Sequence, residues 1–174
     1  MSDDLSRAVV SVSSPKISRS LYICNAEKRE LAAFRQRYPG LAASQLAEVH
    51  EIEYPARDGI TIPAYLTLPQ GLSPESADKL PFVVLPHAGP HARDFRRFDW
   101  TAQMLADEGY GVIQMNFPGS TGYGVAFEKA ERKQWGDVML NDINDATRWL
   151  VDNALAEPSR ICIVGEVFGG YAAM

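Results

Sequence analysis

Three short, largely apolar runs constrain the fold of this chain most strongly. They are residues 81–86 (PFVVLP), 110–117 (YGVIQMNF) and 160–165 (RICIVG). Largely apolar runs of this length are typical of strands that are buried on both faces. Helical stretches at about residues 98–108 and 138–155 separate the three runs. The order strand, helix, strand, helix, strand predicts right-handed parallel crossovers in an α/β sheet with helices on both faces.

The helix expected at 138–155 has the clearest pattern in the chain. One apolar stripe, spaced i, i+4, i+7 and i+11, consists of Met139, Ile143, Ala146 and Leu150. Three aspartates are expected opposite this stripe or beside it: Asp142, Asp145 and Asp152. Asp137 stands where it could cap the start of the helix. Gly109 is expected to end the earlier helix in the left-handed conformation.

The first third of the chain has a different pattern. Three short β segments fall within residues 5–35, and a polar stretch with Pro39-Gly40 follows them. After it, two alternating runs flank Asp58-Gly59, a strong hairpin signal. We therefore expect residues 1–37 to form a β-rich segment, 38–50 a linker, and 51–174 a partial α/β domain.

Composition and charge exclude several classes of function. A formal net charge of −5 argues against a nucleic-acid-binding protein, because no basic stripe could neutralise phosphates. The basic cluster Arg93, Arg96 and Arg97 is interleaved with Asp94 and Asp99, which is typical of a solvated loop or helix start. No apolar run approaches the length of a membrane span, so no membrane partner is expected.

Cysteine usage and the N-terminus point to the cytoplasm. The two cysteines, Cys24 and Cys162, lie far apart and suit a reduced protein better than a disulfide framework. The first residues are acidic and lack a signal-peptide run. Cys162 falls within a strand, where we expect it to be buried and unreactive.

The last apolar run leads into the segment 165–171, GEVFGGY. A strand that ends in G-x-S-x-G and opens a helix is the nucleophile elbow of α/β-hydrolases, but Val167 stands in the serine position. Gly165, Gly169 and Gly170 would let strand and helix cross closely. The backbone N–H of Phe168 would point into the oxyanion site. Alone, the segment also fits other glycine-rich turns, such as a phosphate-binding loop.

The loop after residues 81–86 begins His87-Ala88-Gly89-Pro90. In hydrolases of this architecture that loop supplies the second oxyanion donor, so Ala88 N–H is the candidate and Gly89 N–H the next. His87 is expected to order the loop by hydrogen bonding. A metal site at His87 and His91 would need at least one further ligand, and none is evident. We predict neither a metal nor a cofactor.

A glycine-rich loop, residues 116–124 (NFPGSTGYG), follows the second apolar run. A nucleotide-binding loop is disfavoured because the glycines are spaced G-x-x-G-x-G and no helix is expected there. Ser120 and Thr121 are interpreted as turn hydroxyls, since neither stands on an elbow.

Four segments together resemble the catalytic domain of the prolyl oligopeptidase family, in its acylaminoacyl-peptidase and dipeptidyl-aminopeptidase branch. They are PFVVLPHAGPHARD, GYGVIQMNFPGSTGYG, QWGDVMLNDINDATRWLVD and RICIVGEVFGGYAAM. The resemblance covers residues 51–174 and implies the first half of an α/β-hydrolase domain. It also implies that residues 5–35 are the tail of a β-propeller. The implied activity is serine-type hydrolysis of short peptides near their N-terminus through an acyl-enzyme.

The sequence departs from the family in ways that bear on this activity. Valine replaces serine at 167, Ala88 replaces a loop glycine, and Pro118 stands where the family usually has arginine. The family's catalytic aspartate and histidine come after the nucleophile, and no aspartate or histidine stands between Val167 and residue 174. We therefore predict an inactive chain, so that serine restored at 167 alone would not restore activity. The alternatives are a non-catalytic module that binds peptides or partners, and an esterase-like fragment.

Two structural expectations follow from this assignment. The elbow residue normally needs a positive φ, which is unfavourable for a β-branched side chain. Val167 should therefore be a backbone outlier, or the turn should have relaxed. The strand at 160–165 would keep one unpaired edge, so we expect contact with the missing C-terminal half or self-association there.

Overall fold

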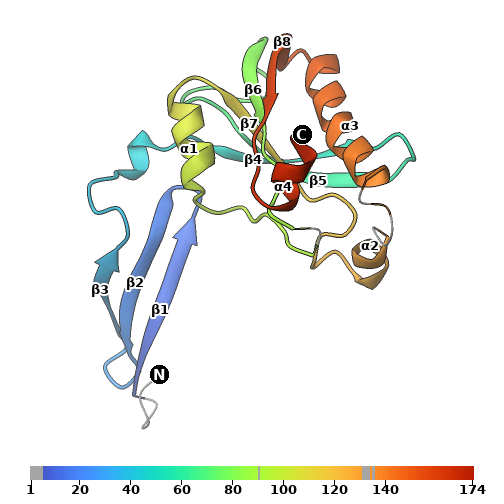
Figure 1. Ribbon diagram of the computed structural model, residues 1–174. Coiled ribbons are helices and arrows are strands. Elements are labelled where there is room, and N and C mark those ends of the chain that lie inside the picture. The colour runs from blue at the N-terminus through green and yellow to red at the C-terminus, as the bar shows by residue number, and fades with distance from the viewer. Residues whose placement is uncertain (1–5, 90, 131–133, 135) are drawn as a thin grey trace.

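Two separate β-sheets organise the chain (Figure 1). The computed structural model describes residues 6–89, 91–130, 134 and 136–174. A three-stranded sheet is followed by a 3₁₀ turn at Ala43–Gln45 and then by a five-stranded sheet with helices packed on it. The β-rich segment and the partial α/β-hydrolase domain predicted from the sequence are both present.

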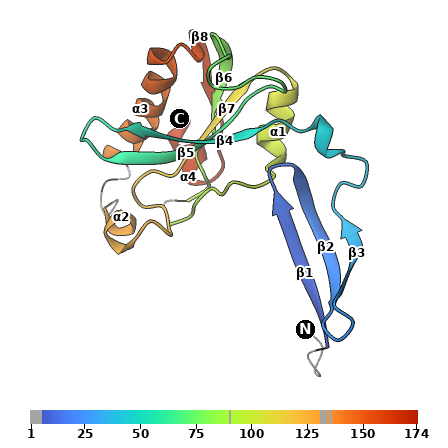
Figure 2. The ribbon, with the colours of Figure 1, turned by 180° about the vertical axis from the view of Figure 1, so that it is seen from behind.

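The three-stranded sheet consists of β1 (Arg7–Ser14), β2 (Ile17–Asn25) and β3 (Glu30–Gln36). Its strands are antiparallel in the order β1-β2-β3, so the predicted succession of three strands is confirmed. Both ribbon views show this sheet extending away from the rest of the molecule (Figures 1 and 2). Every residue of β3 is exposed. The origin of this sheet in a β-propeller remains a prediction, as do the domain boundaries.

The larger sheet has the order β4-β5-β7-β6-β8. Its strands are β4 (Val49–Pro55), β5 (Thr61–Thr67), β6 (Leu80–Val84), β7 (Gly111–Met115) and β8 (Ala156–Ile163). β6 pairs in parallel with β7 and β8, as the sequence predicts, whereas β4, β5 and β7 pair antiparallel. The predicted hairpin turn lies between β4 and β5, where Gly59 has φ 87°.

Helices cover both faces of this sheet. The fully buried stripe Met139, Ile143, Ala146 and Leu150 of α3 (Val138–Asp152) packs in the main core with side chains such as Tyr54 and Phe82. On the other face, Ala102 of α1 (Trp100–Asp107) packs with Val83 and Val112. Both helices lie where the sequence predicts them. Gly109 follows α1 with φ 89°, in the left-handed conformation that was expected. None of the described helices is long and apolar enough to cross a membrane.

β8 differs from the expectation of a strand buried on both faces. It lies at the end of the strand order, and half of its residues are exposed. Cys162 is one of them, so the expectation of a buried thiol is wrong. The apolar run that suggested burial packs through Ile161 and Ile163, which are only partly covered.

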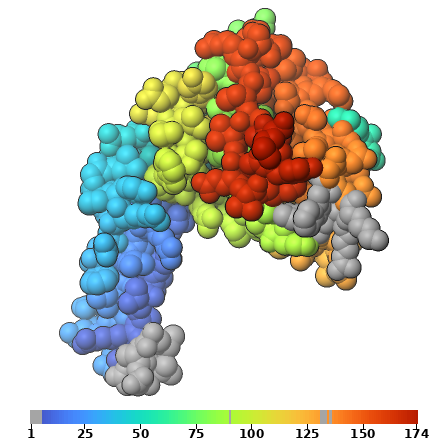
Figure 3. Space-filling view, in the orientation of Figure 1, coloured from blue at the N-terminus to red at the C-terminus, as the bar shows by residue number. Residues whose placement is uncertain are grey.

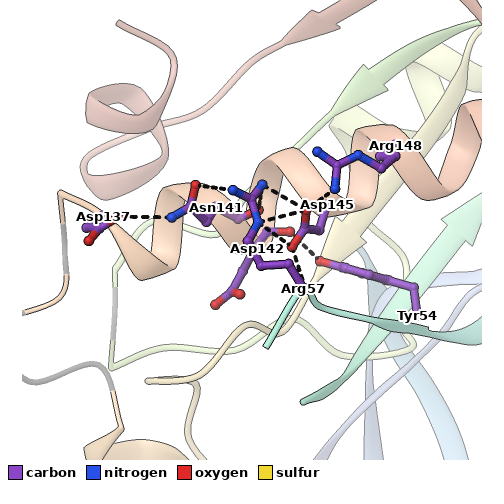
Figure 4. A network of polar contacts seen from close by, with 7 residues as sticks. All are labelled: Tyr54, Arg57, Asp137, Asn141, Asp142, Asp145 and Arg148. Carbon is purple, nitrogen blue, oxygen red and sulfur yellow. Dashed lines mark hydrogen bonds and ion pairs between the residues drawn. The ribbon is translucent and has the colours of Figure 1, made fainter. Parts of the chain in front are cut away.

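A polar network ties the β4–β5 hairpin to α3 (Figure 4). Arg57, in the hairpin turn, donates from its backbone N–H and its guanidinium to the Asp145 carboxylate, with two contacts of 2.8 Å. Asp142 and Asp145, which were expected opposite the apolar stripe or beside it, are buried, because Arg57 and the hairpin cover this side of the helix. Asp137 makes no side-chain cap; its Oδ1 accepts from Asn141 instead.

Candidate functional site

The segment after β8 forms a sharp strand-to-helix turn. β8 ends at Ile163, and α4 (Phe168–Ala172) begins directly after Val167. Val167 has φ 53° and ψ −111°, and 80% of its side chain is exposed. The predicted backbone outlier is therefore present, and the turn has not relaxed. Figure 3 shows this C-terminal part of the chain, in red, at the surface of the molecule.

The glycines around the elbow permit contacts that no side chain would allow. A Cβ on Gly165 would lie 2.3 Å from the backbone carbon of Gly169. A Cβ on Gly169 would lie 2.5 Å from the carbonyl oxygen of Pro86, and one on Gly170 would lie 3.2 Å from the carbonyl oxygen of Gly165. The strand, the helix and the loop after β6 meet at these positions, and this close packing holds Val167 at the tip of the turn.

The backbone N–H of Phe168 has a partner within the protein. It donates to the carbonyl oxygen of Ala88, at 3.1 Å. This N–H is the donor that the sequence assigns to the oxyanion site, and here it faces a carbonyl of the opposite loop. Ala88 itself is exposed, and Gly89 accepts a hydrogen bond from Ala92. The donor roles of Ala88 N–H and Gly89 N–H remain predictions, and Pro90 lies outside the described residues.

His87 orders the loop after β6, as the sequence predicts. Its Nε2 lies 2.9 Å from the Ser120 hydroxyl, and its ring stacks on Phe117 with centroids 4.5 Å apart. Burial lowers the pKa of His87 to about 4, so the imidazole is neutral at pH 7. Ser120 is fully buried, which fits a turn hydroxyl rather than a nucleophile. A short helix, α2 (Val125–Lys129), follows this loop, where none is expected from the sequence.

A second set of side chains near this loop was not predicted from the sequence. Asn116 accepts from the Asp94 backbone N–H at 2.7 Å, donates to the Asp94 carbonyl at 3.2 Å, and donates to the Tyr123 hydroxyl at 2.8 Å. Arg93 lies over the rings of Phe95 and Tyr123, with 4.6 Å to each centroid. The arginine cluster, which was expected in a solvated loop or helix start, lies in a loop before α1, and polar contacts order this loop. The only sequence signal was the polar Asn116 directly after an apolar strand.

In this loop, the carboxyl group of Asp94 has a strongly shifted pKa. Burial raises its pKa to about 7, with a smaller contribution from the nearby charge of Asp99. Within the described part of the chain, its Oδ2 is buried without a hydrogen-bond partner. Asp94 lines a cavity of about 380 Å³ that also contacts Pro86–Ala88 and Val164–Glu166. This cavity lies where the carboxyl ends of β6 and β8 meet.

Among the residues that the structure describes, no group of three or more His, Cys, Asp or Glu side chains could hold a metal ion.

Comparison with known proteins decides the family. Residues 96–174 match the model of the Prolyl oligopeptidase family. Dipeptidyl aminopeptidase BIII of Pseudoxanthomonas mexicana is 36% identical over 140 residues, which cover 78% of this chain and 20% of that protein. The chain belongs to the prolyl oligopeptidase family. Dipeptidyl peptidase family member 6 of Caenorhabditis elegans is 31% identical over 100% of this chain and 26% of its own length.

A solved structure supports the same conclusion. A puromycin-hydrolyzing peptidase of Mycobacterium tuberculosis superposes with a TM-score of 0.84 at 29% identity, covering 97% of this chain and 26% of that one. The serine-peptidase family predicted from the motifs is therefore confirmed. The chain spans between a fifth and about a quarter of the length of these relatives.

Proposed function

We propose that this chain is a peptide-binding member of the prolyl oligopeptidase family that does not form an acyl-enzyme. One observation carries the proposal: the side chain at the tip of the elbow is the isopropyl group of Val167. This group has no lone pair with which to attack a carbonyl and no proton to transfer. Loss of the nucleophile alone costs about 10⁶ in turnover in a serine peptidase.

The backbone around Val167 supports the same conclusion. A substrate carbonyl could accept from Phe168 N–H only by displacing the Ala88 carbonyl oxygen, which lies 3.1 Å from the nitrogen. One oxyanion donor is worth about 10²–10³ in turnover. Neither Ser120 nor Cys162 replaces the serine. The Ser120 hydroxyl is buried against His87, and Cys162 belongs to β8 rather than to the elbow.

Peptides are the proposed ligands for two reasons. Relatives that align with most of this chain are named dipeptidyl peptidases, although the chain spans only part of their length. In addition, the 380 Å³ cavity lies beside the elbow, at the carboxyl ends of parallel strands, where α/β proteins commonly bind ligands.

A fluorophosphonate probe tests the absence of acylation. The 174-residue chain is incubated with the probe alongside the dipeptidyl aminopeptidase BIII as the positive control. We expect labelling of the control and none of this chain. Labelling of this chain would contradict the proposal.

Calorimetric titration with short peptides tests the binding half of the proposal. Heat of binding that saturates, without release of any cleaved product by mass spectrometry, is the expected result. Cleavage of the peptide, or no saturable binding of any peptide tested, would contradict it.

A further inference from the structure

A second cavity, of about 430 Å³, lies between the three-stranded sheet and the start of α1. Three arginines line it: Arg19 from β2, Arg37 just after β3, and Arg97 from the loop before α1. Three aromatic side chains complete much of its wall: Tyr38, Phe98 and Trp100. The elements involved are far apart in the sequence, so only the folded chain brings these arginines together.

Strand register explains why the arginines converge. Leu21 of β2 pairs with Arg35 of β3, and alternation places Arg19 and Arg37 on the same face of the sheet as this pair. The Arg37 backbone N–H donates to the Arg19 carbonyl at 3.1 Å, which holds the two residues side by side. A neighbouring cavity of about 300 Å³ contacts Arg19, Arg35 and Arg37, so the basic surface continues along the sheet.

Among the described residues, the positive charge of this cavity is only partly balanced, by Asp99 in its wall and by the charge interaction of Arg97 with Asp94. Within the described residues, Arg19, Arg37 and Arg97 make no ion pair; Arg19 Nε donates to the Ser11 hydroxyl at 3.2 Å. Asp99 is the one carboxylate in the wall, and its Oδ1 accepts the capping hydrogen bond from Ala102 N–H at 2.9 Å. Such a concentration of unpaired guanidinium groups is unexpected in a chain with a net charge of −5.

We propose that this cavity binds the C-terminal carboxylate of a short peptide. Guanidinium groups match a carboxylate with paired N–H donors, and several of them around one cavity favour an oxyanion strongly. The aromatic wall suits an apolar side chain next to that carboxylate: the rings of Tyr38 and Phe98 lie 5.6 Å apart, and 57% of Trp100 is exposed.

The two cavities share part of their walls. Arg97, Asp99 and Trp100 line both the arginine cavity and the cavity beside the elbow. A peptide that lies beside the elbow with its C-terminus on the side of α1 would therefore reach the arginines. The inference deepens the proposed function, on which it rests, by naming the end of the peptide that is recognised.

The test compares two forms of one peptide by isothermal titration. The probes are N-acetyl-Ala-Ala-Phe with a free carboxylate and the same peptide as its C-terminal amide. They are titrated into the wild-type chain and into Arg37→Gln, Arg97→Gln and Arg160→Gln. Arg160 is an exposed arginine of β8 outside both cavities, so it is the matched control. Inorganic phosphate, titrated alone, separates carboxylate recognition from a general preference for anions.

The acid is expected to bind wild type at least tenfold more tightly than the amide, because charge-assisted hydrogen bonds are lost in the amide. Arg37→Gln and Arg97→Gln should each weaken binding of the acid by about tenfold and leave the amide unchanged, whereas Arg160→Gln should change neither.

Three results would overturn the inference. Equal affinity for acid and amide would refute the carboxylate site while peptide binding stood. Tighter binding of inorganic phosphate than of the acid would assign the arginines to another anion. If neither peptide bound, the proposed function would fail together with the inference.

Discussion

The backbone N–H of Phe168 donates a hydrogen bond to the carbonyl oxygen of Ala88 at 3.1 Å, across the junction of the elbow and the loop after β6. The first N–H groups of a helix have no partner within that helix, and the Ala88 carbonyl supplies one for α4. The contact depends on close packing, since a Cβ on Gly169 would lie 2.5 Å from the carbonyl oxygen of Pro86. The elbow and the loop therefore form one packed unit, and substitutions at its glycines should disturb both.

Alanine at Gly165 or Gly169 should destabilise the fold. The added methyl group would overlap backbone atoms at 2.3 Å and 2.5 Å respectively, and backbone cannot move aside as a side chain can. We expect a loss of about 1–3 kcal/mol for each, as in other overpacked sites. Gly40→Ala is the matched control, because its Cβ would meet nothing within 4 Å. Chemical denaturation measures the effect, and equal stability of all three variants would contradict the packing described.

Glycine at position 167 should stabilise the protein. Val167 holds φ 53° and ψ −111°, a region that is unfavourable for any side chain and most of all for a β-branched one. Release of this strain is worth about 1–3 kcal/mol and exceeds the backbone-entropy cost of glycine, about 0.5–1 kcal/mol. Little burial is lost, because 80% of the valine is exposed. Val167→Gly should therefore melt at a higher temperature than wild type, with Val167→Ala between them, and a lower melting temperature for the glycine variant would show that the turn is unstrained.

Arg57→Ala should destabilise the protein more than Arg148→Ala. Both side chains contact the buried Asp145 carboxylate, but Arg57 makes several contacts and Arg148 one, at 3.3 Å. Without Arg57, Asp145 would keep only the more exposed partner, so we expect a loss of about 1–3 kcal/mol, against less than about 1 kcal/mol for Arg148→Ala.

Acid should reduce this difference. The Arg57 hydrogen bonds lower the pKa of Asp145 in the folded state. Such a carboxylate contributes stability above its unfolded pKa of about 4, and this contribution is lost as the pH falls through the lowered folded value. The gap between wild type and Arg57→Ala, measured by denaturation at pH 7 and in acid, should narrow in acid. A gap independent of pH would mean that the arginine acts through packing alone.

Local sequence patterns predicted the parts of the fold that depend on local periodicity. The apolar stripe of α3, the buried β7 and the glycine turn at Gly59 all follow from spacing along a single element. The same reasoning did not reveal the burial of Asp145, because its partner Arg57 lies 88 residues earlier and a helical pattern cannot show such a partner. It failed for Cys162 because an apolar run resembles a buried strand whatever its place in the sheet order.

The candidate site shows the same division. A motif with fixed spacing located the elbow and required a positive φ at Val167, which the structure confirms. The contact between Phe168 and Ala88 is a backbone hydrogen bond between distant segments, and no side chain signals it. The position of the Asp94 backbone likewise depends on Asn116, 22 residues later in the chain. Polar contacts between segments far apart in the chain were thus not predicted from the sequence.

Asp142→Asn should stabilise the protein at neutral and higher pH but not in acid. Burial, together with the charges of Asp58 and Asp145, raises the pKa of Asp142 to about 7, against the opposing effect of Arg57. In the unfolded chain the same group titrates near pH 4, so between these values folding takes up a proton. The free energy of unfolding contributed by this group is therefore full below about pH 4 and is lost as the pH rises to about 7. Asparagine removes this dependence while keeping the shape of the side chain.

The measurement is the free energy of unfolding of wild type and Asp142→Asn, obtained by chemical denaturation from pH 4 to pH 8. The advantage of the variant should grow across this range, level off above about pH 7, and reach the order of a few kcal/mol at most. Asp152→Asn serves as the control, since Asp152 is exposed at the end of the same helix. A constant difference between wild type and Asp142→Asn across the range would mean that Asp142 is already ionised in the folded protein in acid, with Arg57 outweighing the burial of the carboxyl group.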